Sequence, residues 1–219
     1  MDERTTGLIL RTRLLTDTSL IVHWLTPDLG RLATVAKGAR RPKSPFLGKL
    51  DLFYLADFSF RRSRRGDLHI LREVSVREFH PLLRRELGCL QQAAYFAQLV
   101  ELTTETETPL STLFELFVDA LNFLIEHPRL PLAVHAFEIK LLRELGLEPD
   151  YAKCALAAES KDVLKRVANT EWPALRQMSL DAKQSAQIGR FLSGWLLHHF
   201  GKVPSARPHF RNSIGEFRS

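Results

Sequence analysis

Cysteine is scarce in this chain: only Cys89 and Cys154 occur among its 219 residues. A disulfide framework needs more cysteines than this, and so does a zinc site built mainly from thiolates. No apolar run approaches the roughly 20 residues of a membrane-spanning helix, and the start of the chain lacks the basic and apolar regions of a secretory signal. These absences predict a cytoplasmic protein without a membrane segment.

Sequence motifs of catalysis are also missing. The chain has no G-x-x-x-x-G-K-[ST] phosphate loop, no H-E-x-x-H zinc helix and no G-x-S-x-G nucleophile turn. The carboxylates at Glu101, Glu105 and Glu107 are more typical of a solvated helix end than of a two-metal nuclease site. We therefore expect a protein that is not an enzyme and that needs no metal and no cofactor.

Positive charge is unevenly distributed along the chain. Residues 1–80 hold 15 Lys and Arg against 9 Asp and Glu, whereas the remaining residues hold 16 of each. The formal net charge of +6 therefore belongs entirely to the first part of the chain. A basic module joined to a neutral one is the pattern expected of a nucleic-acid-binding domain on a structural body.

The first eighty residues alternate between apolar and polar side chains, as half-buried strands do. Turn residues separate the runs, which predict strands at 6–15, 19–26, 31–37, 50–60 and 67–77. Five short strands in about eighty residues are typical of a small β-barrel, and the five-stranded OB-fold is the common one that binds nucleic acid.

After His80–Pro81 the apolar period lengthens to that of an α-helix. We expect helices at 87–102, from Thr108 (cap) and Pro109 (first turn) to His127, at 133–145 and around 188–200. Residues 147–178 are ambiguous, and within them residues 153–169 predict either a loop with a short helix or an irregular excursion. The sequence thus predicts a multidomain α+β protein, with an OB-fold barrel at 1–80, an α-helical domain at 81–210 and a flexible tail at 211–219.

Two clusters of cations lie in the predicted loops of the barrel. The stretch from Lys37 to Lys49 holds five cations and no acidic residue, and a run of arginines at 61–65 fills the turn before the last strand. Long cationic side chains on loops follow a phosphate backbone and release its counterions. We predict that nucleic-acid phosphates contact nine side chains: Lys37, Arg40, Arg41, Lys43, Lys49, Arg61, Arg62, Arg64 and Arg65.

Four aromatic residues, Phe53, Tyr54, Phe58 and Phe60, lie between these clusters. Any of them that faces outward would stack on a base, a contact worth roughly 1–3 kcal/mol. Alternating aromatic residues of a small barrel more often fill its core. Both interpretations stay open at this point.

Several segments resemble the RecO family of bacterial recombination mediators. The likeness is strongest at Val35–Arg41 (Val-Ala-Lys-Gly-Ala-Arg-Arg) and includes Asp17–Leu20, Phe137–Gly146 and the closing Gly201–Arg207. The resemblance covers nearly the whole chain. It implies an N-terminal OB-fold, a C-terminal helical domain and a role in DNA repair and homologous recombination.

The resemblance also implies partners. Members of this family bind single- and double-stranded DNA, anneal complementary strands without ATP on DNA coated by the single-stranded DNA-binding protein SSB, and help RecR to load the RecA recombinase. Lys140 and Arg143 are candidates for binding the acidic SSB tail, and nucleoid association would follow from DNA binding. Many members carry a four-cysteine zinc site that begins near Cys154. Ala157 stands at the next cysteine position, so we expect no zinc here.

Three alternatives fit the residues alone. An RNA-binding OB-fold protein of RNA metabolism would use the same cations, and competition between RNA and DNA would separate the two. A metal-dependent nuclease would use scattered carboxylates, since the sequence lacks a compact acidic motif, and a test for cleavage that depends on a divalent metal would decide it. A structural adaptor would hold an acidic protein on the same basic loops.

Overall fold

The computed structural model describes residues 2–127 and 132–208. The chain folds into two compact units. One takes in residues 1–82 and 103–115, and the other takes in residues 83–102 and the chain from 116 onward. The predicted tail at 211–219 lies outside the described residues. Over the described ranges, no helix is long and apolar enough to cross a membrane.

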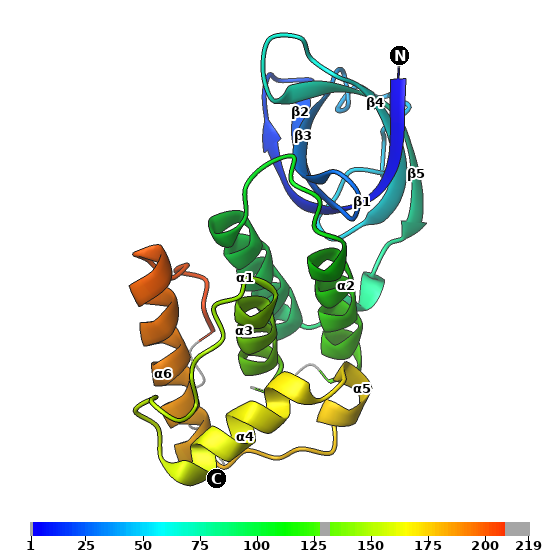
Figure 1. Cartoon of the computed structure of the whole chain (residues 1–219). Coiled ribbons are helices and arrows are strands. Elements are labelled where there is room, and N and C mark those ends of the chain that lie inside the picture. Colours follow the sequence, from blue (N-terminus) through cyan, green and yellow to red (C-terminus); the bar gives the residue numbers. More distant parts are fainter. Residues whose placement is uncertain (1, 128–131, 209–219) are drawn as a thin grey trace, which may run out of the picture. The chain divides into compact units, whose positions relative to one another are not determined.

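The first unit contains a closed five-stranded barrel (Figure 1). Its strands are β1 (Asp2–Leu14), β2 (Leu20–Thr26), β3 (Gly30–Ala36), β4 (Leu55–Arg61) and β5 (Leu68–Glu78). Around the barrel they follow the order β1-β2-β3-β5-β4, and all pairs are antiparallel except β3 with β5. The predicted α+β class and the OB-type barrel are confirmed.

β4 begins at Leu55, whereas the sequence predicts a start at residue 50. Phe53 has a left-handed backbone with φ of 62°, and its N–H donates to the carbonyl of Ile9 at 2.8 Å. A residue in this conformation interrupts an extended run. The stretch at 50–54 therefore turns instead of lengthening β4.

Aromatic side chains fill the barrel. Trp24 stacks on Phe58 with ring centroids 4.0 Å apart, and its indole N–H donates to the Thr34 hydroxyl at 2.9 Å. Phe53, Phe58 and Phe60 are buried, so the core interpretation is correct for these three. Tyr54 is half-buried and packs edge-on against Phe79.

The segment at residues 103–110 pairs with the barrel. β3 and β5 are paired only where Ala33–Val35 face Leu68–Ile70. Beyond that contact, Thr106 forms a parallel bridge with Arg31, and the Glu107 N–H donates to the Arg31 carbonyl at 2.8 Å. The 103–110 segment thus continues the sheet where β5 does not reach.

This pairing corrects one predicted helix start. The helix expected from Thr108 begins instead at Ser111. The backbone before it bonds to the barrel, since the N–H of Leu110 donates to the carbonyl of Pro27. Glycine at position 30 permits the approach: its φ is 66°, and a Cβ there would lie 1.8 Å from the Thr108 carbonyl oxygen.

The chain beyond β5 is helical. A short 3-10 turn at Pro81–Arg84 precedes α1 (Leu87–Thr103), α2 (Ser111–Glu126), α3 (Leu132–Glu144), α4 (Ala158–Asn169), α5 (Trp172–Leu175) and α6 (Ala182–Phe200). α6 begins with a capping box between Asp181 and Gln184 and ends at the left-handed Gly201. Residues 153–169 hold one helix, α4, so the loop with a short helix is the correct alternative there, and α5 follows in the rest of the ambiguous stretch.

A buried ion pair joins the chain after α6 to α3 in the second unit. Glu138 is fully buried, and its two oxygens accept from Nε and Nη2 of Arg207 at 2.7 and 2.9 Å. The hydroxyl of Tyr95 donates to the same carboxylate at 2.5 Å. Burial alone would raise the pKa of Glu138, but the contacts with His135 and Arg207 outweigh it and lower this pKa. The carboxylate is therefore charged at neutral pH.

Replacing Gly30 tests the approach of the 103–110 segment. Gly30→Ala adds both left-handed strain and a collision with Thr108, for a combined cost of about 3 kcal/mol. Gly48→Ala is the matched control, because Gly48 has φ of 72° with nothing within 4 Å of an added Cβ. Hydrogen exchange should show the Glu107 amide losing protection in Gly30→Ala alone. Equal protection in the two variants would contradict the described packing.

Replacing Glu138 tests the buried pair. Glu138→Gln leaves the Arg207 charge without its counter-ion and should cost about 3–5 kcal/mol at pH 7 in urea denaturation followed by circular dichroism. Glu144→Gln, an exposed position on the same helix, should stay within about 0.5 kcal/mol of the unmodified protein.

The pH dependence of the Glu138→Gln effect has a definite sign. The folded pKa of Glu138 lies below its unfolded value, so the carboxylate stabilises the fold above about pH 4.3 and stops doing so as pH falls through the folded pKa. The stability gap between the unmodified protein and Glu138→Gln should narrow as pH is lowered from 7 to 3. A constant gap would show that the charge of Glu138 is not what stabilises the fold.

Candidate nucleic-acid interface

The basic loop, residues 37–49, presents its cations on a series of tight turns. Successive backbone bonds run from Arg41 to Gly38, from Ser44 to Arg41, from Leu47 to Ser44 and from Lys49 to Phe46. Phe46 is buried in the barrel core and anchors the loop. Lys37, Arg40, Arg41 and Lys43 are exposed, and within the described residues none of them forms an ion pair. Their charge is available to an anionic ligand.

The basic loop is also fastened to the β1–β2 turn. The Gly38 N–H donates to Ser19 Oγ at 3.2 Å, and the Arg40 N–H donates to the carbonyl of Thr18 at 3.0 Å. The Arg40 guanidinium adds a bond to the carbonyl of Asp17. Arg41 lies across Gly38, whose added Cβ would be 3.3 Å from Arg41 Cδ. These bonds give the cations a defined position on the barrel.

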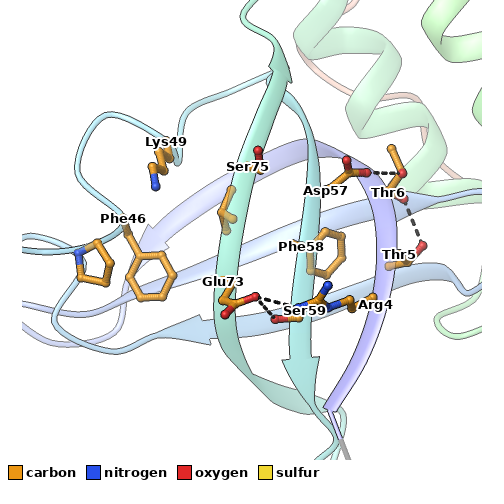
Figure 2. Close-up of a pocket in the computed structure, with 12 residues that line it drawn as sticks. Arg4, Thr5, Thr6, Phe46, Lys49, Asp57, Phe58, Ser59, Glu73 and Ser75 are labelled. Atoms are coloured by element: carbon orange, nitrogen blue, oxygen red, sulfur yellow. Dashed lines mark hydrogen bonds and ion pairs between the residues drawn. The ribbon is translucent and has the colours of Figure 1, made fainter.

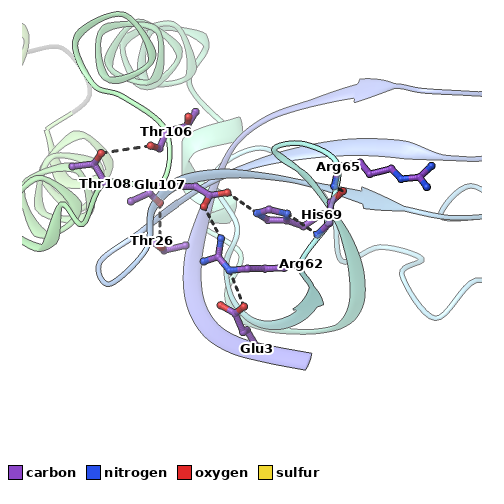
Figure 3. A network of polar contacts seen from close by, with 10 residues as sticks. Glu3, Thr26, Arg62, Arg65, His69, Thr106, Glu107 and Thr108 are labelled. Atoms are coloured by element: carbon purple, nitrogen blue, oxygen red, sulfur yellow. Dashed lines mark hydrogen bonds and ion pairs between the residues drawn. The ribbon is translucent and has the colours of Figure 1, made fainter. Parts of the chain in front are cut away.

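The basic turn, residues 61–67, is partly neutralised (Figure 3). Arg61 pairs with Asp2 at 2.9 Å. Arg62 pairs with Glu3 at 2.7 Å and with Glu107, from the 103–110 segment, at 2.5 Å. Three carboxylates therefore offset two of the predicted phosphate contacts.

His69 bonds to the second carboxylate oxygen of Glu107, the one that Arg62 does not contact. Its Nδ1 accepts the Ser63 N–H, so in the neutral ring Nε2 carries the proton and donates to Glu107 at 2.8 Å. Burial opposes ionisation of Glu107, but the bonds from Arg62 and His69 prevail and lower its pKa. Arg64 and Arg65, in contrast, are exposed, and neither forms an ion pair with any residue that the structure describes.

A third group of cations was not among the predicted contacts. The register places Arg11 opposite His23 and Arg13 opposite Ile21 on the outer face of β1 and β2. Burial first, and then the charges of Arg11, Arg13 and Arg31, lower the pKa of His23 to about 4. The spacing of Arg11 and Arg13 by two residues in a strand was the available sequence signal, because residues i and i+2 share a face.

The part of the barrel along β1, β4 and β5 has mixed charge (Figure 2). A hollow of about 670 Å³ is lined by Arg4 and Lys49 but also by Asp57 and Glu73. The hydrogen bond from Thr6 and then the pairing with Arg77 lower the pKa of Asp57, although burial opposes this. Ionised carboxylates repel phosphate, so this hollow is a poor nucleic-acid site and Lys49 lies at its edge.

Lys140 and Arg143 have internal partners. The Lys140 ammonium donates to the carbonyls of Ala168 and Thr170, at 3.3 and 2.7 Å. Arg143 donates to the Ala168 carbonyl and pairs with Glu148 at 2.8 Å. Both cations thus satisfy carbonyls at the end of α4, which a helix leaves without intrahelical partners.

The cysteines stand apart from any cluster of metal ligands. Cys89 is buried and donates to the carbonyl of Leu124, while Cys154 is half-buried beside the carbonyl of Tyr151. Between residues 2 and 127 and between 132 and 208, no group of three or more His, Cys, Asp or Glu side chains is placed to hold a metal ion.

Comparison with known proteins finds the same family in both parts of the chain. The family model described as Recombination protein O N terminal matches residues 1–80, and the one described as Recombination protein O C terminal matches residues 90–161.

Several curated relatives carry the name DNA repair protein RecO. One from Rhodopirellula baltica is 32% identical, with 74% of this chain and 60% of the relative aligned. One from Anaeromyxobacter sp. strain K is 35% identical over 68% of this chain and 59% of the relative. The chain therefore spans about three fifths of the length of these two relatives. One from Anaeromyxobacter dehalogenans strain 2CP-C is 34% identical over 96% of both chains. By these matches and by its fold, the chain belongs to the RecO family.

Proposed function

We propose that this protein is a DNA repair and recombination mediator that binds single- and double-stranded DNA through its barrel. The observation that carries the proposal is the basic loop, where Lys37, Arg40, Arg41 and Lys43 are exposed together without an ion pair to any described residue. Each cation that neutralises a phosphate releases counterions, so a cluster of exposed cations binds a polyanion strongly at low salt.

The nine predicted contacts divide by environment. The exposed cations of the basic loop, with Arg64 and Arg65, are the main phosphate contacts in this proposal. Arg61 and Arg62 contribute less, since Asp2, Glu3 and Glu107 already offset their charges.

We further propose that the protein anneals complementary strands without ATP on DNA coated by SSB, and that it helps RecR to load RecA. Annealing requires no catalytic residue. A cationic surface that screens the repulsion between two phosphate backbones is sufficient. The absence of a phosphate-loop motif from the sequence is consistent with a reaction that uses no nucleotide.

The acidic SSB tail remains the proposed partner of the helical unit. An acidic tail that bound Lys140 or Arg143 would compete with the carbonyls of Ala168 and Thr170 and with the carboxylate of Glu148. A cytoplasmic, nucleoid-associated location completes the proposal.

Two double variants test the assignment of the basic loop. Arg40→Ala with Arg41→Ala should weaken binding to a single strand and make the slope of log K against log salt shallower by about 1.4, or about 0.7 per phosphate contact. Arg61→Ala with Arg62→Ala removes the same number of arginines but should change the slope less, because these two are ion-paired. Fluorescence anisotropy from 50 to 300 mM salt measures both.

An unchanged slope in a folded Arg40→Ala, Arg41→Ala protein would overturn the assignment of the basic loop. Equal changes in the two double variants would show that the ion pairs at Arg61 and Arg62 do not withhold those residues from DNA.

A further inference from the structure

A separate hollow of about 470 Å³ opens between the β1–β2 turn and the start of the basic loop. This volume lies within the roughly 300–1,000 Å³ that is typical of small-molecule sites. Its lining residues come from the β1–β2 turn, β3 and the basic loop: Leu15, Thr16, Thr18, Ser19, Val35, Lys37, Gly38 and Arg41.

The lining combines two kinds of surface. Leu15, which is 46% exposed, and the buried Val35 supply apolar walls. Three hydroxyl side chains line the turn, and Lys37 and Arg41 supply positive charge. Apolar walls beside cations and hydroxyls match a nucleotide, which has a flat apolar base joined to an anionic phosphate.

The walls of this hollow are held together before any ligand arrives. The backbone N–H of Leu15 donates to the Ser19 carbonyl at 3.0 Å, and the backbone N–H of Ser19 donates to Thr16 Oγ1 at 3.1 Å. Ser19 Oγ accepts the Gly38 N–H, which joins the turn to the loop. A site whose walls are already ordered loses less entropy on binding than one that must form around its ligand.

We propose that this hollow binds one unstacked nucleotide of a single strand, with its base against Leu15 and Val35 and its phosphate on Lys37 and Arg41. The inference rests on the proposed function, and it adds a contact with a base to the phosphate contacts described above. A duplex keeps its bases paired and stacked, so it offers no base to the hollow and contacts only the cations.

The neighbouring strand face extends this site. Arg13 is exposed on β1 two residues before Leu15, and Arg11 precedes it by two residues on the same face of the strand. Carboxylates are absent from the lining of the hollow, in contrast to the mixed hollow beside Asp57 and Glu73. A strand whose nucleotide occupies the hollow therefore continues over positive charge.

Leu15→Ala tests the base contact, with Leu197→Ala as its matched control. Leu197 is an exposed leucine of α6, 53% accessible, that belongs neither to the hollow nor to the basic loop. Three probes are compared by anisotropy: a 20-nucleotide oligo(dT), an abasic strand of the same length and a 20-base-pair duplex. Leu15→Ala should weaken oligo(dT) binding about fivefold and leave the other two affinities unchanged. Leu197→Ala should leave all three unchanged.

Methyl NMR gives a second readout that needs no substitution in the binding site. The Leu15 methyl resonances should shift with oligo(dT) and stay in place with the abasic strand, since the ring current comes from a base. The Leu197 methyl resonances should move with neither probe.

Each other outcome counts against the proposal. The nucleotide site would be overturned, while DNA binding by the basic loop stands, if Leu15→Ala behaved as Leu197→Ala does or weakened binding of the abasic strand as much as binding of oligo(dT). Failure of the unmodified protein to bind any of the three probes would overturn the proposed function and this site together.

Discussion

The burial of Phe46 in the barrel core is the constraint on which the candidate interface depends. The basic loop holds five cationic side chains and no acidic residue, and the mutual repulsion of these cations opposes a fixed arrangement. Phe46, buried against the core of the barrel, fixes the middle of the loop. The bonds from Gly38 and Arg40 to the β1–β2 turn fix its start. The cations are thereby held at the surface instead of spreading apart.

The second basic cluster shows that a run of arginines does not by itself make a polyanion site. Asp2, Glu3 and Glu107 offset Arg61 and Arg62. Glu107 reaches this turn only because the 103–110 segment pairs with β3 beside Gly30. The same segment that completes the barrel wall also reduces the charge of the turn. Among the described residues, positive charge that these carboxylates do not offset lies on the basic loop, on Arg64 and Arg65, and on Arg13 of β1.

Local patterns in the sequence predicted the parts of the fold that depend on local physics. Alternation predicted the five strands. The helical period predicted α1 and α3 to within one residue, and α6 from Ile188 to its end, six residues after its start at Ala182. The return of residues 103–115 to the barrel was not predictable, because it is a backbone pairing between distant residues and leaves no apolar period. For the same reason the sequence did not predict the partners of Arg62, because Glu3 and Glu107 lie 59 and 45 residues away from it in the chain. Arg11 and Arg13 did have a signal, their shared strand face.

Annealing of complementary single strands pre-coated with SSB, without ATP, tests the central claim most directly. The account predicts rapid annealing by the unmodified protein and slow annealing when Arg40 and Arg41 are both replaced by alanine, with the fold intact. If the unmodified, folded protein binds DNA but does not accelerate annealing, the mediator function is contradicted. If the double variant anneals as fast as the unmodified protein, the basic loop is not the surface that carries the reaction.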